Sequence, residues 1–400
     1  MHELKNGIRL IHQHTDSPVA YSALMINAGS RDELNHEIGA AHLAEHLIFK
    51  ETHKRKAYHI LNRLENVGGD LNAYTTKEDT CIHAAFLNEH YARALELFSD
   101  IVFGHKITKD AFDIEKKVVS DEIKSYMDNP SEMIFDHFDE LLFSGHPLGN
   151  STLGTIQQIK KINIPSVEQF ISRNYIPGQI VISSVGNIPF KRLVYFVEKY
   201  MSHYPPGTKE VSRQVPAVAP SFSVSCNKKN HQVHCIMGRT CESSDRKFRI
   251  AMTMLTNLLG GPGMNTRLNM SMRERNGWVY HVEASYTPYS DVGVFNIYFG
   301  TDKIYLDQCL SQVKRELAKL KNTLLKDSQL KKLQQQIIGQ LAIGSDNSDA
   351  RMLSNGKSLL MYHHVDNLQD ICKQIIDIDA RYLNDVANRV FDHLNILVYQ

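Results

Sequence analysis

Two histidines separated by three residues stand near the start of the chain, with a glutamate directly before the second one. His42 and His46 are four residues apart, so in a helix they lie on one face, one turn above the other. That spacing lets two imidazoles reach one ion, as a zinc site of the His-x-x-x-His kind requires. Glu45 would lie beside a metal-bound water without being a ligand, as hydrolytic zinc needs. Two solvated histidines on a partly exposed helix are the alternative interpretation.

A third metal ligand is required, and a later helical stretch carries two candidate carboxylates. Glu115 and Glu122 are seven residues apart, which is about two helical turns, so they share a face. On a surface helix such glutamates are usually solvated. The residues alone therefore leave open whether either glutamate binds a metal.

The patterns around these residues predict an α+β fold in which strands come in adjacent pairs with helices grouped between them. In the first half we expect strands over 8–12, 19–27, 70–75, 80–86 and 180–185, and helices over 38–50, 57–67 and within 89–143. The second half repeats this order, with strands over 222–225, 232–237, 279–286, 292–299 and 394–399, and helices over 248–259, 303–320 and 328–342. We therefore expect two homologous domains, each a largely antiparallel sheet packed with helices.

Length and composition agree with two domains. The 400 residues exceed what one hydrophobic core usually serves. A stretch with four prolines and one glycine, 205–220, is the best candidate linker, so we expect domains over 1–204 and 221–400.

Charge and cysteine usage exclude several classes of protein. The 45 Lys and Arg nearly cancel the 44 Asp and Glu, which gives no indication of nucleic acid or of an anionic membrane as a partner. The six cysteines form no Cys-x-x-Cys pair, so a disulfide framework or a zinc finger is not expected. There is no apolar run of the roughly 20 residues that a spanning helix needs, and no secretory signal is visible. We expect a cytoplasmic protein.

The segment 42–50 resembles the inverzincin zinc peptidases, the family that contains pitrilysin, insulin-degrading enzyme and the mitochondrial processing peptidase. In that family the third ligand follows the second histidine by 76 residues, which selects Glu122. A family glutamate seven residues earlier matches Glu115 and supports a ligand without touching the metal. The resemblance thus implies one zinc ion per chain, bound by His42, His46 and Glu122.

The resemblance extends over nearly the whole chain. Segments 28–33 and 68–80 resemble the family's stretch before the motif helix and its substrate-binding strand, and 146–155 resembles the loop after the third ligand. Segment 273–280 matches the family's Arg and Tyr seven residues apart. Glu51 replaces a usual Gly and Trp278 a common Leu, but neither would touch a ligand.

The resemblance implies a zinc endopeptidase that hydrolyses peptides or unfolded polypeptide segments through a zinc-bound water, with Glu45 as the base. Tyr280 would share the oxyanion charge with zinc, and Arg273 would hold or orient the substrate backbone. Without the family spacing, a surface salt bridge for Arg273 and core packing for Tyr280 remain open.

The segment around Asn72 looks like an exposed strand edge to which a peptide can add. We expect Asn72, Ala73 and Tyr74 to bind substrate. Asn72 could instead be a turn residue, and alternation alone leaves Tyr74 facing either a substrate pocket or the core.

Family members of about twice this length build a closed chamber from two bilobal halves, with zinc in the first half and the Arg and Tyr in the second. This chain has the length of one half, like a single-half bacterial-type member, yet it carries both sets of residues. The simplest expectation is a homodimer with shared active sites, and a heterodimer is possible. The rival hypothesis is a non-catalytic or partner subunit of a processing-peptidase-like complex. A weaker one is a zinc hydrolase that acts on a small molecule.

Overall fold

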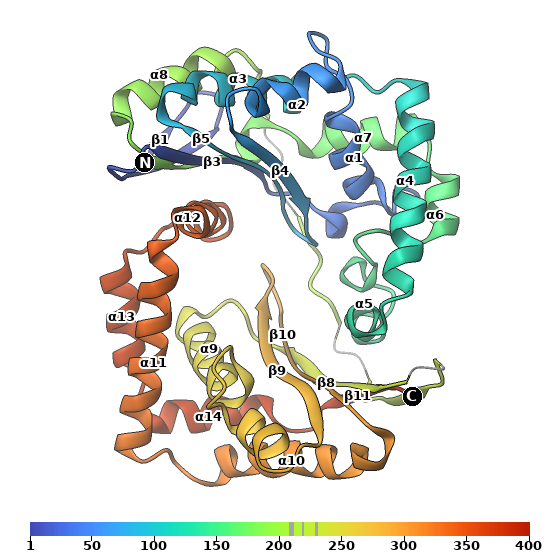
Figure 1. The fold of residues 1–400 in the computed structure, drawn as a ribbon, viewed down its shortest axis with the longest axis vertical. Helices are drawn as coiled ribbons and strands as arrows, with labels where there is room; N and C mark the ends of the chain where they lie inside the picture. The colour runs from blue at the N-terminus through green and yellow to red at the C-terminus, as the bar shows by residue number, and fades with distance from the viewer. Residues whose placement is uncertain (208–211, 218–219, 229–230) are drawn as a thin grey trace. The chain divides into compact units, whose positions relative to one another are not determined.

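The computed structural model describes residues 1–207, 212–217, 220–228 and 231–400, and contains two β-sheets, each packed with helices (Figure 1). The expected α+β fold class is confirmed. No helix among these residues is long and apolar enough to cross a membrane.

The first sheet has six strands in the order β1-β2-β6-β3-β5-β4. Neighbouring strands are antiparallel except for β2 and β6, which are parallel. Among the residues that the structure describes, β4 pairs only with β5, so it is an edge strand of this sheet. The strand bounds are His2–Glu3 (β1), Arg9–His14 (β2), Val19–Ile26 (β3), Asp70–Thr75 (β4), Thr80–Leu87 (β5) and Ile180–Gly186 (β6).

Helices cover both faces of the first sheet. The larger core lies under α1 (Ala40–Ile48), α2 (Ala57–Glu65), α3 (Tyr91–Phe103), α4 (Lys109–Met127), α6 (Ile156–Lys161), α7 (Ile164–Asn174) and α8 (Phe190–Met201). Helix α12 (Ser348–Tyr362) packs on the opposite face. The two-residue period of a strand divides the side chains between these cores: Leu24 belongs to the first, whereas Ala23 and Met25 belong to the second.

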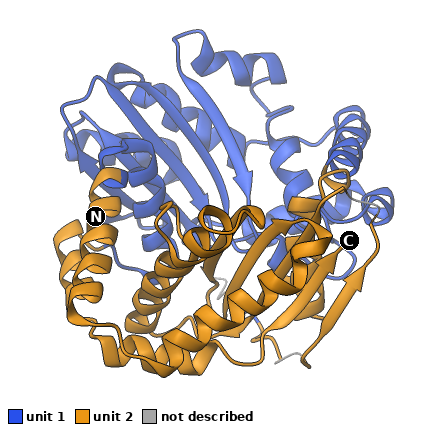
Figure 2. Ribbon diagram, turned by 60° about the horizontal axis from the view of Figure 1, so that its bottom comes forward, with its two compact units in different colours: residues 1–125, 150–213, 344–365 blue, residues 126–149, 214–343, 366–400 orange. Residues whose placement is uncertain are grey.

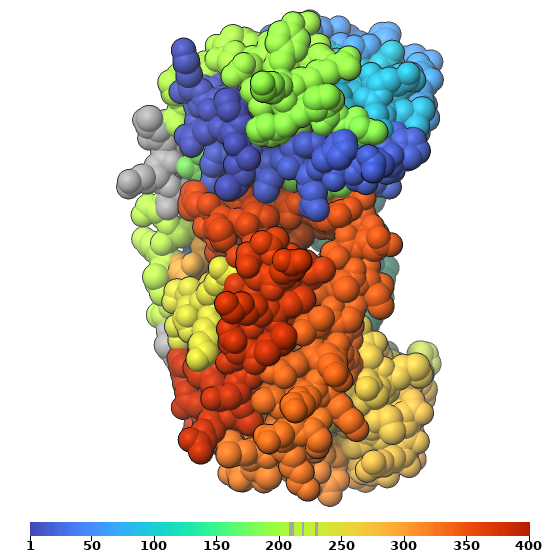
Figure 3. Space-filling model, turned by 90° about the vertical axis from the view of Figure 1, so that its left-hand side faces the viewer, coloured from blue at the N-terminus to red at the C-terminus, as the bar shows by residue number. Residues whose placement is uncertain are grey.

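The second sheet has five strands in the order β7-β11-β8-β10-β9, and only β7 and β11 are parallel. Its strand bounds are Ser223–Cys226 (β7), Val233–Cys241 (β8), Val279–Pro288 (β9), Gly293–Thr301 (β10) and Asn395–Tyr399 (β11). Its helices are α5 (Pro130–Leu142), α9 (Arg246–Gly260), α10 (Leu306–Asn322), α11 (Asp327–Asp346), α13 (Leu368–Ile376) and α14 (Ala380–Val390). Figure 3 shows the C-terminal part of the chain, in orange and red, gathered on one face.

Contacts within the chain define two compact units that are not continuous in sequence (Figure 2). Unit 1 contains residues 1–125, 150–213 and 344–365, and unit 2 contains 126–149, 214–343 and 366–400. The division into 1–204, 205–220 and 221–400 concerns homologous stretches of sequence and stays a prediction. Part of the expected linker, 208–211 and 218–219, lies outside the described residues.

Helix α12 was not among the elements expected from the sequence. It has few apolar residues to mark its buried face, namely Met352, Leu359 and Leu360. A glycine allows close packing, since a Cβ at Gly356 would lie 2.6 Å from the sulfur of Met25. The hydroxyl of Ser183 in β6 donates to the carbonyl of Met352 at 2.6 Å. Such contacts cannot be read from local periodicity.

Helix α1 carries the His-x-x-x-His motif and is held by its surroundings. Its small and aliphatic residues are buried: Ala40, Ala41, Leu43, Ala44, Leu47 and Ile48. A helix of nine residues is marginal alone, so packing must stabilise it. Its N-cap, Gly39, adopts a left-handed φ of 93° and offers no side-chain acceptor. The buried carboxylate of Glu33 takes that role, accepting from the N–H groups of Gly39 at 3.1 Å and Ala41 at 2.8 Å.

The titration of Glu33 should appear in the pH dependence of stability. Burial raises the pKa of Glu33 to about 8, although the hydrogen bonds from the two backbone N–H groups lower it. The charge of Glu37 raises this pKa further, and the charge of Lys77 lowers it. A carboxyl group whose pKa is raised by folding stabilises the fold most below its unfolded pKa, and the contribution is lost as pH rises through about 8. In urea unfolding of metal-free protein, the stability difference between wild type and Glu33→Gln should therefore fall from about pH 5.5 to about pH 8.5.

The matched control is Glu65→Gln on the exposed end of α2, which should show no such trend. A difference for Glu33→Gln that grows with pH would contradict the prediction. It would mean that the hydrogen bonds from the two N–H groups lower the pKa of Glu33 by more than burial raises it.

Candidate metal centre

Helices α1 and α4 bring three potential metal ligands together in unit 1. Nitrogens of His42 and His46 and a carboxylate oxygen of Glu122 all lie within 4.8 Å of one another. Within the described ranges, no other group of three or more His, Cys, Asp or Glu residues has this geometry. The structure therefore places the three residues expected from the sequence around one point.

The separations leave room for an ion. Nε2 of His42 lies 3.8 Å from Oε1 of Glu122, and Nε2 of His46 lies 3.7 Å from Oε2. These distances are too long for hydrogen bonds. Two donors each about 2.0–2.2 Å from a tetrahedral zinc would lie roughly 3.3–3.6 Å apart, so small side-chain movements would complete the site.

The first histidine has the protonation state that a metal ligand needs. Burial, with a smaller effect of His46, lowers the pKa of His42 to about 4, so its imidazole is neutral near neutral pH. Its Nδ1 is buried and has no hydrogen-bond partner among the described residues. A neutral imidazole presents the lone pair that coordination uses.

The second histidine is oriented from behind by Glu115. Oε2 of Glu115 lies 3.0 Å from Nδ1 of His46, and Oε1 lies 2.9 Å from Nζ of Lys50. When the Glu115 carboxylate accepts a hydrogen bond from Nδ1–H, the lone pair of Nε2 faces Glu122. The Glu115 side chain is only 3% exposed, whereas that of Glu122 is 44% exposed. The two carboxylates on one helix are thus placed for different tasks.

Glu45 lies on α1 between the two histidines in sequence and points to the end of strand β4. Its Oε2 accepts a hydrogen bond from the hydroxyl of Thr75 at 2.6 Å. Burial raises the pKa of Glu45, while the Thr75 hydroxyl and then His46 lower it and the charge of Glu122 raises it. The carboxylate is therefore partly buried beside the ligands but is not one of them.

The proposed substrate residues lie on β4. Asn72 is exposed, and its side-chain amide donates to Asp70 at 3.1 Å. Ala73 packs against the larger core, whereas Tyr74 packs on the α12 side, against the core that contains Cys81. The exposed edge expected here is present, while the binding roles of Asn72, Ala73 and Tyr74 stay predictions.

Arg273 and Tyr280 lie in unit 2, whereas the metal ligands lie in unit 1. Arg273 is exposed near the end of a π-helical turn, Asn269–Glu274, and Gly277 N–H donates to its carbonyl. Tyr280 lies on the edge strand β9 and is 64% exposed, with its hydroxyl 3.4 Å from Asp302. This exposure removes the packed-core interpretation of Tyr280, and the catalytic roles of both residues stay predictions.

The sequence did not point to Thr75, Glu33 or Lys50 as part of this site. Their side chains contact Glu45, the start of α1 and Glu115, respectively. Each contact joins elements that are distant in sequence or in different secondary structure. All three residues lie within segments that resemble the family, 28–33, 42–50 and 68–80, but the resemblance gave none of them a role in the site.

Two protein-family models match the sequence of this chain. The model described as insulinase (peptidase family M16) matches residues 9–156, and the model described as the peptidase M16 inactive domain matches residues 161–337. The first match covers every residue of the metal group, and the second covers Arg273 and Tyr280.

Relatives match the chain over almost its full length. A zinc protease of Bacillus subtilis (strain 168), itself uncharacterized, is 29% identical over 388 residues, which is 97% of this chain and 94% of that protein. An uncharacterized zinc protease of Rickettsia bellii (strain RML369-C) is 29% identical over 391 residues, 97% of this chain and 94% of that protein.

Solved structures share the fold. A protease from Helicobacter pylori superposes with a TM-score of 0.92 at 21% identity, covering 100% of this chain and 98% of that one. A chain of complex III2 from Candida albicans superposes with a TM-score of 0.83 at 18% identity, covering 100% and 94%. The two family models, the full-length zinc protease relatives and the shared fold together show that this chain belongs to peptidase family M16, the insulinase family.

Proposed function

We propose that this protein is a zinc-dependent endopeptidase that hydrolyses peptides or unfolded polypeptide segments. The observation that carries the proposal is the convergence of His42, His46 and Glu122 within 4.8 Å, next to the partly buried carboxylate of Glu45. The full-length relatives named zinc proteases support it. His42, His46 and Glu122 would hold the zinc, and Glu115 would orient His46.

When bound, zinc supplies Lewis acidity and lowers the pKa of a water in its open coordination position. Glu45 acts as the base: its carboxylate takes a proton as the water oxygen bonds to the peptide carbonyl carbon. Glu45 then returns that proton to the amide nitrogen as the carbon–nitrogen bond breaks. The products are one carboxylic acid and one amine. The proton that remains on the carboxylic acid passes to the amine or to solvent, which leaves a carboxylate, and Glu45 ends the cycle deprotonated, as it began.

The substrate would add to the free edge of β4. Backbone hydrogen bonds supply affinity on a strand edge and are largely indifferent to side chains, which suits a peptidase acting on many sequences. Asn72, Ala73 and Tyr74 would make these contacts. An extended peptide fits this edge better than a small molecule does.

We further propose that the active enzyme is a homodimer in which Arg273 and Tyr280 of one subunit complete the zinc site of the other. The exposure of both residues leaves them free to contact a substrate or a second subunit. Tyr280 would donate to the oxyanion and Arg273 would hold the peptide backbone. A heterodimer with a related chain is the alternative assembly.

The alternative function is that of a non-catalytic subunit in a larger complex. The occurrence of this fold in a chain of complex III2 from Candida albicans supports that alternative. A structural subunit has no physical need for the complete set of His42, His46, Glu45 and Glu122. The retention of this set in one place favours the enzyme.

The ligand assignment predicts different effects for two similar substitutions on α4. Purified protein should bind about one zinc per chain, and Glu122→Gln should weaken zinc affinity more than Glu115→Gln, which still leaves three ligands in place. Competition with a chromogenic chelator measures both affinities. An unchanged affinity in Glu122→Gln together with loss of zinc in Glu115→Gln would reverse the assignment.

The base assignment predicts that Glu45→Gln keeps its zinc and its fold but loses at least about 99% of turnover on a mixed peptide library. The carboxylate is needed for proton transfer and not for coordination. Glu65→Gln, on an exposed part of α2, is the matched control and should retain wild-type turnover. Substantial hydrolysis by zinc-loaded Glu45→Gln would remove Glu45 from this role, whereas an inactive wild type that binds zinc would favour the non-catalytic subunit.

The shared-site assembly predicts complementation between two inactive variants. A mixed dimer of Glu45→Gln and Arg273→Ala has one site with both lesions and one site with neither. With free exchange about half of the dimers are mixed, so activity should recover to roughly a quarter of wild type. Absence of recovery, once subunit exchange is confirmed by mass spectrometry of tagged subunits, would reject the shared site.

A further inference from the structure

We propose that Thr75 is a positioning residue that orients the carboxylate of Glu45 for proton transfer; the inference rests on the proposed function. The hydroxyl of Thr75 donates to Oε2 of Glu45 at 2.6 Å, the short end of the range for a bond to a carboxylate. Among the described residues no other side chain or backbone group hydrogen-bonds to the Glu45 carboxylate. One hydrogen bond thus fixes one oxygen and leaves Oε1 as the acceptor for the incoming proton.

An orienting hydrogen bond is useful only if its donor is itself fixed. Thr75 is the last residue of β4 and pairs with Thr80 in β5 across a tight turn. Within that turn the N–H of Thr76 donates to the carbonyl of Asp79 at 2.8 Å, and the Thr76 hydroxyl donates to the Asp79 carboxylate at 2.8 Å. The turn that follows Thr75 is therefore closed by its own hydrogen bonds.

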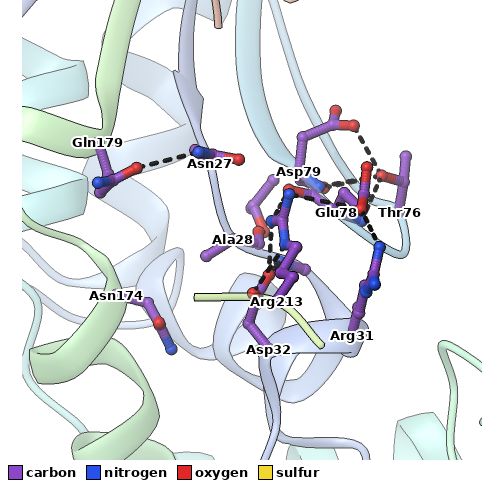
Figure 4. A network of polar contacts seen from close by, with 12 residues as sticks. Asn27, Ala28, Arg31, Asp32, Thr76, Glu78, Asp79, Asn174, Gln179 and Arg213 are labelled. Atoms are coloured by element: carbon purple, nitrogen blue, oxygen red, sulfur yellow. Dashed lines mark hydrogen bonds and ion pairs between the residues drawn. The ribbon is translucent and has the colours of Figure 1, made fainter. Parts of the chain in front are cut away.

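Buried ion pairs anchor the same turn from outside (Figure 4). Nη1 of Arg31 lies 2.6 Å from Oε1 of Glu78, and both side chains are at most 5% exposed. Arg213 donates to both oxygens of Asp32, at 3.0 and 2.8 Å, and to the carbonyl of Glu78 at 2.9 Å. Removing one partner of such a pair would leave a buried charge without its partner, which is strongly unfavourable, so these pairs favour this position of the turn.

Helix α12 adds a further contact. Nζ of Lys357 lies 3.2 Å from the carboxylate of Asp79, whose side chain is 4% exposed. The turn of residues 76–79 is thus tied to the segment before α1, to Arg213 and to α12. These ties hold Thr75 in place on one side of Glu45, while α1 holds Glu45 on the other.

The position of Thr75 also links substrate binding to the base. Residues 72–74 offer the strand edge on which a peptide would pair, and Thr75 is the next residue of the same strand. Alternation along β4 directs Tyr74 to the α12 side and Thr75 to the α1 side. One rigid strand therefore sets both where the peptide backbone lies and where the base is aimed.

The test removes the hydroxyl while keeping the shape of the side chain. Thr75→Val should keep one zinc per chain and a KM within about twofold of wild type, but lower kcat by about 10- to 100-fold, as loss of an orienting contact does. Thr75→Ser keeps the hydroxyl and should restore kcat to within about threefold. Thr52→Val is the matched control, because the Thr52 hydroxyl also donates to a carboxylate, Asp100, at 2.8 Å, without touching Glu45.

Two further variants keep the test decisive. If Thr75→Val does not fold, Thr75→Ser and Thr75→Ala are compared, since these differ by one hydroxyl; a kcat difference of at least tenfold supports the inference. A wild-type kcat in Thr75→Val would overturn the inference. So would an equal loss of kcat in Thr75→Ser and in the variant without a hydroxyl, Thr75→Val or Thr75→Ala. Glu45→Gln is measured in the same assay: if it is inactive while Thr75→Val is fully active, only this inference fails, whereas an active Glu45→Gln overturns the proposed function.

Discussion

The imidazoles of His42 and His46 can reach one ion because they lie one helical turn apart, and the helix that carries them is too short to be stable by itself. Helix α1 has nine residues and no capping side chain at its N-cap, Gly39. Small residues bring it close to the core, and Glu33 satisfies the N–H groups of Gly39 and Ala41 from outside the helix. Burying its leucine and isoleucine side chains, at about 1.5–3 kcal/mol each, offsets part of the cost of ordering so short a helix. The spacing of the ligands thus depends on the packing of the whole unit.

The second helix shows how burial divides two identical side chains between two tasks. Glu115 and Glu122 lie on one face of α4, but the first is enclosed between His46 and Lys50 and the second is open. A buried carboxylate already paired with two cationic or proton-donating groups has no oxygen to spare for a metal. The exposed carboxylate of Glu122 lies opposite Nε2 of both histidines and can bind a metal ion. Glu45, whose Oε2 is engaged by Thr75, lies beside the ligands without being one of them.

The parts of the site that follow from local periodicity could be predicted from the sequence. The face shared by His42 and His46, the pairing of β4 with β5 and the α+β fold belong to this class, and the structure confirms them. Glu122 needed the family spacing, because two carboxylates on one helix face cannot be told apart without their burial. Glu33, Thr75 and α12 were not predicted, since their contacts join segments whose proximity only the folded chain creates.

The central claim is that folding of unit 1 presents two imidazoles and one carboxylate to a single zinc ion. X-ray absorption at the zinc K edge of the purified holoprotein tests it most directly. The account predicts a first shell of nitrogen and oxygen at about 2.0–2.2 Å, with the multiple scattering of about two imidazoles and no sulfur. That shell should lose an imidazole in His46→Ala. A sulfur contribution near 2.3 Å, or an imidazole count unchanged in His46→Ala, would contradict the account.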